Sequence, residues 1–215
     1  MYGDDIIYKK QEHRGYTCKV VYDPDPISPD DWDTLGTIYA NSRNHNPQNH
    51  TLDEIMVEDE TDDAGMHIDP NYIFIRIYAY EHSGIALHAS TSPQRCGWDE
   101  YLFGVMAVHK DKAAKEFGDI TNVENYEKVM KCLGGEVECW DMYYEGQVFG
   151  FEVLDEDDNE VDSCWGFYGY DGAKEAMQEG IGIIDYKVDE QERAEAEEAA
   201  RIQYYEMITE PFWID

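Results

Sequence analysis

Four residues between positions 82 and 99 could support covalent chemistry. His82 and Ser83 stand in one turn, and Cys96 and Asp99 follow in a second loop around Trp98. A thiol activated by a histidine that a carboxylate orients is a nucleophilic arrangement. The same residue types also serve as a turn histidine, a buried thiol and a packed tryptophan, and we expect these structural roles. A small enzyme or ligand-binding module acting on a nucleotide signal through His82, Cys96 and Asp99 stays open as an alternative.

Two groups of residues invite a metal-binding hypothesis. The stretch Asp155-x-Asp157-x-Asn159 begins like a calcium-binding EF-hand loop, but Glu160 replaces its turn glycine and Gly166 replaces its bidentate acid. The seven histidines and five cysteines contain no pair with zinc-finger, zinc-ribbon or H-E-x-x-H spacing. There is also no phosphate-binding loop, dinucleotide fingerprint or hydrolase elbow. We therefore predict no metal and no cofactor, while a looser calcium or magnesium site at 155–160 stays open.

The high content of carboxylates is the chemical feature that clearly sets this sequence apart from an ordinary soluble domain. The 215 residues contain 48 Asp and Glu against 16 Lys and Arg, a net charge of −32. A magnitude of about 2–8 is enough to keep a small domain soluble. The charge is concentrated in the segments 23–69, 136–171 and 172–215, while residues 70–135 are nearly neutral. Self-repulsion on this scale destabilises a compact fold, so a function that uses the field is the better explanation.

The sign of the charge indicates the kind of partner. Duplex DNA carries about one charge per 1.7 Å, so 32 charges correspond to about 54 Å of duplex. An acidic chain repels nucleic acid and anionic lipid, which argues against direct nucleic-acid or membrane binding. We predict instead the basic surface of a nucleic-acid-binding host protein, and a homodimer is left open. The predicted partner-binding residues are Asp53, Glu54, Glu58, Asp59, Glu60, Asp62, Asp63, Asp155, Glu156, Asp157, Asp158, Glu160, Glu190, Glu192, Glu195, Glu197 and Glu198.

The elements that must position these residues indicate an α+β fold. We expect an antiparallel sheet of about five strands with helices packed on one side, a long acidic loop and an acidic C-terminal helix. Alternating β-forming residues predict strands at 16–22, 72–80, 85–89 and 101–109, with Ile73, Ile75 and Ile77 on one face. A hairpin is predicted from 147–154 and 160–168, with an acidic tip. Residues 41–71 read as a loop.

Helix signals complete the prediction. Ser28 and Pro29 are typical of a helix start. A short helix is expected over 110–117, and a longer one from the Thr121/Glu124 capping box toward position 144, where a Gly-Gly pair at 134–135 allows a kink or a split. The Ala- and Glu-rich stretch 189–209 predicts a final helix. We expect one domain over 1–186 and an acidic helical extension over 187–215.

Several phrases of the sequence resemble a known family. They are Trp32-Asp33-Thr34-Leu35-Gly36-Thr37, His82-Ser83-Gly84, Cys96-Gly97-Trp98-Asp99 and Asp162-Ser163-Cys164-Trp165-Gly166-Phe167-Tyr168-Gly169. In this order they resemble uncharacterised proteins encoded by tailed bacteriophages and related mobile elements, over roughly residues 16–170. The resemblance implies a viral origin and carries over no catalytic residue.

Composition and resemblance together give the functional hypothesis. The first residues lack the apolar region of a signal peptide, no stretch approaches the roughly 18 apolar residues of a membrane span, and the cysteines show no disulfide pattern, which favours the host cytoplasm. By charge analogy the chain is similar to DNA-mimic inhibitors of restriction, CRISPR or repair enzymes. We therefore expect a phage-encoded, non-enzymatic anti-defence inhibitor. A solvating or structural phage protein stays open.

Overall fold

The structure is a computed structural model that describes residues 6–41, 46–57 and 66–209. The fold is α+β, with two sheets and three α-helices in the described residues. The chain forms two compact units, one made of Met1–Pro24 with Phe149–Asp215 and the other of Asp25–Val148. This division differs from the expected single domain over 1–186, because the chain leaves the first unit after its opening strands and returns to it for a hairpin and the last helix.

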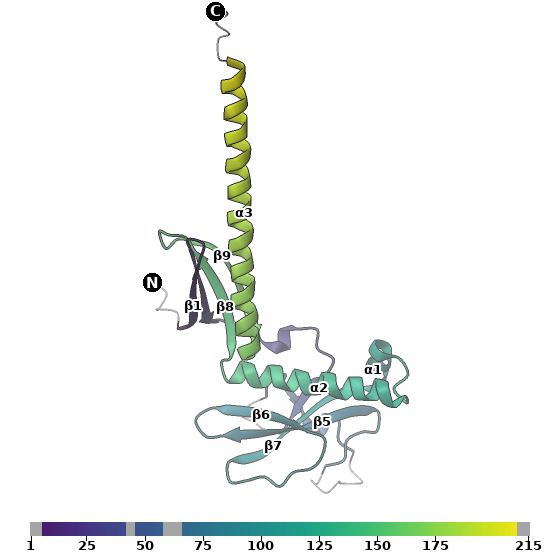
Figure 1. Ribbon diagram of the computed structural model, residues 1–215. Coiled ribbons are helices and arrows are strands. Elements are labelled where there is room, and N and C mark those ends of the chain that lie inside the picture. Colours follow the sequence, from purple (N-terminus) through teal and green to yellow (C-terminus); the bar gives the residue numbers. More distant parts are fainter. Residues whose placement is uncertain (1–5, 42–45, 58–65, 210–215) are drawn as a thin grey trace, which may run out of the picture. The chain divides into compact units, whose positions relative to one another are not determined.

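The unit formed by residues 25–148 contains a five-stranded sheet (Figure 1). Its strand order is β4 (His50–Thr51), β3 (Thr37–Ala40), β7 (Glu100–His109), β5 (Tyr72–Glu81) and β6 (Ile85–Ser90). Neighbouring strands run antiparallel except β3 and β4, which are parallel. The predicted strands at 72–80, 85–89 and 101–109 are therefore confirmed.

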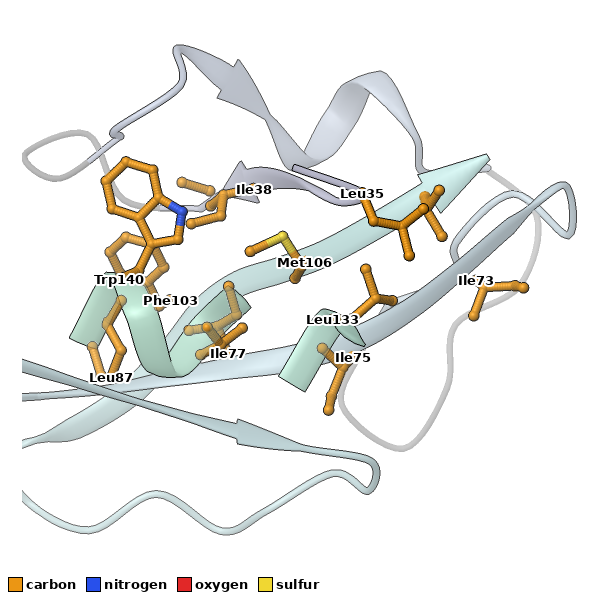
Figure 2. Packing of buried hydrophobic residues seen from close by; sticks show 14 of the residues in the cluster. Leu35, Ile38, Ile73, Ile75, Ile77, Leu87, Phe103, Met106, Leu133 and Trp140 are labelled. Carbon is orange, nitrogen blue, oxygen red and sulfur yellow. The ribbon is translucent and has the colours of Figure 1, made fainter. Parts of the chain in front are cut away.

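Helix α2 (Val123–Tyr144) covers one face of this sheet. Ile73, Ile75 and Ile77 alternate along β5 and lie in the same buried cluster as Leu133 and Trp140 of the helix, as Figure 2 shows. The predicted inward face of β5 is thus confirmed, because a strand that lies on a helix-covered face must place every second side chain in the core.

The helices at 110 and 123 follow their local signals closely. Helix α1 (Lys110–Phe117) ends at Gly118, whose φ of 83° suits a residue without a Cβ. The side chain of Asn122, rather than that of Thr121, caps α2 by accepting a hydrogen bond from the Glu124 backbone N–H. Helix α2 continues through Gly134-Gly135, so the glycine pair does not split it.

The helix predicted after Ser28 is wrong. The Ser28 side chain does cap a helical turn, but that turn is only the short η1 (Pro29–Asp31). Thr37–Ala40 then form β3, which pairs with β7, and Leu35 is buried in the core. A helix through this stretch would have to break the β3 pairing, so tertiary structure overrides a strong local start signal.

The opposite face of the five-stranded sheet is covered by the segment that was predicted to be a loop. This segment contains the short helix η2 (Leu52–Glu54) and a bridge between Met56 and Ile68. Leu52, Ile55 and Ile68 lie in a buried cluster with the sheet residues Val105 and Ala107. The described parts of 41–71 therefore form a covering layer rather than an unpacked excursion.

The other unit contains a four-stranded sheet in the order β1 (Ile7–His13), β2 (Tyr16–Tyr22), β8 (Val148–Leu154) and β9 (Glu160–Tyr168). The predicted strand 16–22 and the 147–168 hairpin are confirmed. Strand β1 was not predicted. Its hairpin turn at Arg14 and Gly15 has positive φ angles of 46° and 86°, the backbone that a two-residue hairpin turn requires.

Helix α3 (Gly169–Thr209) is 41 residues long and starts well before the predicted position 189. Its first half packs on the four-stranded sheet through a buried face that includes Ala173, Ala176 and Ile184. From 189 to 208 every residue is exposed. Figure 1 shows that α3 continues past the tips of both hairpins of its unit. Among the described residues, no helix has the length and apolar character that crossing a bilayer requires.

Candidate functional site

An acidic cleft lies in the unit that contains α3, between the tips of the two hairpins and the helix. Its volume is about 470 Å³. The tip of the β1–β2 hairpin forms one wall, the tip of the β8–β9 hairpin forms another, and α3 forms the third. The lining residues are Arg14, Gly15, Tyr16, Asp155, Glu156, Asp157, Val188, Gln191, Glu192 and Glu195. The cleft therefore brings together residues from three distant parts of the sequence, and five of its ten lining residues are carboxylates.

Arg14 fixes the first hairpin tip to the helix. Its guanidinium donates to Asp185 at 3.3 Å, to Asp189 at 2.6 Å and to Glu192 at 3.0 Å. His13, next to it, lies 2.7 Å from the Asp185 carboxylate. The hydrogen bond with Asp189 and the bonds with the other two acids raise the pKa of Arg14, and the neighbouring His13 and Arg14 lower the pKa of Asp185. The three acids are spaced along one face of α3, so a single cation bridges two helical turns.

The second hairpin tip is held by its own first residue. Asp155 Oδ1 accepts hydrogen bonds from the backbone N–H groups of Asp157 and Asn159, both at 2.9 Å. The Asn159 side chain also donates to Asp155, which lowers the pKa of this carboxyl. Asp158 takes a positive φ of 60° to close the turn. The Asp155 carboxylate accepts the hydrogen bonds that close the turn. Glu156 and Asp157 are therefore the residues of this tip whose carboxylates are available to a ligand in the cleft.

The two tips approach each other closely. A Cβ atom placed on Gly15 would lie 3.1 Å from Glu156 Oε1, so the β1–β2 turn passes directly beside the Glu156 carboxylate. On the helix wall, Gln191 donates to Glu195 at 2.9 Å, which keeps the Glu195 side chain along the helix. The result is a hollow that concentrates negative potential and that contains one internal cation, Arg14, among its lining residues.

The structure unites two of the three predicted acidic runs. Of the predicted residues, Asp155, Glu156, Asp157, Glu192 and Glu195 line the cleft. The other described members of these two runs lie on the same unit but outside the cleft: Asp158 at the hairpin tip, Glu160 where it accepts from Ser163, Glu190 on another side of α3, Glu197 in the exposed half of the helix, and Glu198 paired with Arg201.

The third predicted run, at 53–63, belongs to the other unit. Asp53 is exposed in η2. Glu54 caps the same short helix by accepting from the Thr51 backbone N–H at 2.8 Å, and it pairs with His50 at 2.9 Å, which together lower its pKa. Glu58, Asp59, Glu60, Asp62 and Asp63 lie outside the described residues.

The residues considered for nucleophilic catalysis lie in exposed turns. The backbone pairs Glu81 with Asp99 at 3.0 Å, which brings the two turns close. Yet His82 and Cys96 are exposed, Trp98 is fully exposed, and no hydrogen bond among the described residues joins the side chains of His82, Cys96 and Asp99. Such a surface offers neither the enclosed pocket nor the oriented base that an activated thiol needs.

A second hollow, of about 350 Å³, was not predicted from the sequence. It lies in the unit of residues 25–148 and is lined by Lys112, Cys132 and Glu136, among others. Glu136 accepts hydrogen bonds from the backbone N–H groups of Leu35 at 2.5 Å and Gly36 at 2.8 Å, and burial raises its pKa. Lys112 donates to a backbone carbonyl at 2.7 Å. Both charged groups therefore hold the loop before β3 in place.

The acidic cleft thus has the geometry of a surface that receives a cationic group.

Among the residues that the structure describes, no three His, Cys, Asp or Glu side chains are arranged to hold a metal ion. Comparison of the chain with protein-family models, with curated proteins and with solved structures found no match.

Proposed function

We propose that the protein is a phage-encoded anti-defence inhibitor that binds the basic surface of a host protein that handles DNA or RNA. One observation carries this proposal: the acidic runs at 155–160 and 189–198, which are distant in sequence, meet in one cleft. Solvating charge has no reason to converge, because like charges lower their energy by spreading apart. A cationic partner would recover the free energy that this arrangement costs.

The charge density of α3 supports a DNA-like surface on this chain. Between Asp189 and Glu198 the helix carries six carboxylates and one arginine. With a rise of 1.5 Å per residue these ten residues span about 13.5 Å, or about one net charge per 2.7 Å. One strand of duplex DNA carries a charge about every 3.4 Å, and both strands together about every 1.7 Å. The helix therefore falls within the range of charge density that a DNA-binding channel recognises.

The first experiment identifies the partner. Tagged protein is used to capture binding proteins from host lysate at low and at high salt. We expect recovery of a DNA- or RNA-binding defence protein whose capture weakens as salt rises, because the attraction is electrostatic. Recovery of no such protein, or binding indifferent to salt, would contradict the proposal.

The second experiment places the contact. With the captured protein and a labelled DNA duplex, displacement of the duplex is measured for wild type and for the triple variant Glu156→Gln, Asp157→Asn, Glu195→Gln. We expect displacement to weaken by about tenfold or more, since each of three close charge pairs loses part of its energy. The matched control triple is Glu127→Gln, Glu138→Gln, Glu175→Gln, which removes the same charge at exposed positions outside the cleft. Equal weakening in both triples would show that net charge alone acts.

A further inference from the structure

Exposed apolar side chains lie along α3, both at the end of the half that packs on the sheet and in the outer half. Tyr186, Tyr204 and Met207 are each more than half exposed. A helix in a folded protein is stabilised mainly by burying such side chains, and a segment of about twenty residues exposed on every side gains none of this energy. A contiguous patch of exposed apolar side chains is typical of an interaction surface.

Tyr186, Tyr204 and Met207 lie in a seven-residue repeat along one side of α3, together with the partly buried Ile183. The exposed Ile202, Tyr205 and Ile208 lie outside this repeat. Positions 183, 190, 197 and 204 alternate with 186, 193, 200 and 207, at the spacing of three and four residues that forms one helix face. We call this face the α3 stripe: Ile183, Tyr186, Glu190, Arg193, Glu197, Ala200, Tyr204 and Met207. It is apolar at both ends and charged in the middle.

This order of side chains is self-complementary when two copies run antiparallel. In an antiparallel pair centred on residue 195, each position faces the position that is equally far beyond the centre. Arg193 then faces Glu197 of the second copy, Tyr186 faces Tyr204, and Ile183 faces Met207. Each contact occurs twice by symmetry. A parallel pair would instead place Arg193 against Arg193 and Glu197 against Glu197, which repel.

Two features of the single chain fit this arrangement. Arg193 makes no hydrogen bond or ion pair with any described residue, although it lies in the most acidic stretch of the helix. A mainly apolar groove of about 460 Å³ runs beside Ile183 and Tyr186, with Gly182 leaving space in its floor. In the antiparallel pair this groove is the place that Tyr204 and Met207 of the second copy reach.

We infer that α3 is the interface of an antiparallel homodimer that forms through the α3 stripe. The groove beside Ile183 and the acidic cleft lie on different sides of the helix, because Val188, Glu192 and Glu195 line the cleft while Tyr186 and Glu190 line the groove. Dimerisation therefore leaves the cleft open. The inference that α3 pairs with a second copy stands whether or not the proposed function is correct. The net charge of each chain opposes association, so dimerisation strengthens as salt screens this repulsion.

Charge exchange between two variants tests both the interface and its direction. The full-length variants Arg193→Glu and Glu197→Arg are made separately, and dimer content is measured by sedimentation equilibrium and by native mass spectrometry. Alone, each variant places like charges opposite each other twice, and we expect its dimer dissociation constant to rise by about tenfold or more. When the two variants are mixed, opposite charges face each other at both of these contacts, and we expect the heterodimer to form preferentially.

An aromatic pair of variants tests the apolar ends. Tyr204→Ala removes a stripe residue, whereas Tyr205→Ala removes a neighbour of similar exposure that lies outside the stripe, although its ring centroid is 6.1 Å from that of Tyr204. We expect Tyr204→Ala to weaken the dimer by about tenfold or more and Tyr205→Ala to leave it nearly unchanged. A wild-type protein that stays monomeric at its highest soluble concentration in salt would overturn the inference. So would a mixture of the two charge variants with no more dimer than either alone, or equal effects of the two tyrosine variants.

Discussion

Two glycines in α3, two residues apart, should respond differently to the same substitution. Gly180 is buried against the four-stranded sheet, and a Cβ atom there would lie 2.5 Å from Cys18 Sγ and 3.1 Å from a ring carbon of Phe151. Both of these neighbours are fully buried and cannot move aside easily. A Cβ on Gly182 meets no atom within 4 Å. The two sites share a helix and differ in packing alone.

The magnitudes follow from this difference. Replacing glycine by alanine in a helix interior stabilises by about 1 kcal/mol at either site. Overfilling a packed core costs about 1–3 kcal/mol, and only Gly180→Ala meets that cost. We therefore expect Gly182→Ala to raise the free energy of unfolding by about 1 kcal/mol. The free energy of unfolding of Gly180→Ala should be about 1–3 kcal/mol lower than that of Gly182→Ala.

Urea unfolding followed by far-UV circular dichroism measures both variants, at protein concentrations low enough to keep the chain monomeric. The buried Cys18 thiol, whose pKa burial raises to about 11, gives an independent readout, because a thiol reagent modifies it only when this unit opens. Adding Cys18→Ala to Gly180→Ala should relieve the overlap, so the double variant should lose less stability than the two single losses together. A Gly180→Ala protein as stable as Gly182→Ala would refute the packing argument.

Three further outcomes are expected. Gly134→Ala should stabilise the unit of residues 25–148 by about 1 kcal/mol in thermal unfolding, because α2 is uninterrupted there and a Cβ meets no atom within 4 Å, and a destabilised variant would contradict this. The pKa of Asp185 is lowered in the folded protein, so its carboxylate stabilises the fold above pH 3.8 and this stabilisation is lost as pH falls below that value. Asp185→Asn should therefore be less stable than wild type at neutral pH and should differ from it less in acid; equal acid unfolding of the two proteins would contradict this. Burial raises the pKa of Glu136, so the wild-type protein should lose stability as pH rises above about 4.5 and this carboxyl ionises. Glu136→Gln should lose less stability over the same pH range, and an unchanged dependence of unfolding free energy on pH would contradict this.

Strands with regular alternation could be predicted from the sequence, because the pattern of apolar and polar residues within the strand itself shows which side chains are buried. Ile73, Ile75 and Ile77 needed no tertiary information to be assigned to one face, and the acidic hairpin tip at 155–159 followed from the two β patterns beside it. Helices α1 and α2 were predicted for the same reason. Their caps and stop residues act within a few positions of the helix ends.

Elements that depend on distant partners were missed. The start signal at Ser28 was real, but pairing of β3 with β7 decided the structure beyond it. The first half of α3 contains Gly180 and Gly182, which weaken helix propensity, and it is helical because Ala176 and Ile184 pack on the sheet. Strand β1 is an exception, because it was missed although its partner β2 is adjacent in sequence and Arg14-Gly15 is a turn pair suited to a tight hairpin.

The carboxylates of the acidic cleft were predictable from the sequence, but its geometry was not. The runs at 155–160 and 189–198 stood out by composition, yet only the fold brings Glu156 near Glu192. Arg14, which organises the cleft, gave no sign in the sequence, because its carboxylate partners lie more than 170 residues away. Charge patterns identify what a surface contains, whereas long-range pairing decides where it lies.

The cleft wall and the α3 stripe belong to one continuous helix, and this gives them a thermodynamic link. Carboxylates at Asp189, Glu192 and Glu195 face the cleft side, and their charge contributes to the repulsion between two approaching copies of α3. A cationic ligand in the cleft neutralises part of that charge and so lowers the cost of pairing the helices. By reciprocity, pairing must raise the affinity of the cleft for that ligand by the same factor. Occupancy and assembly would then be cooperative, with no change in the shape of either surface.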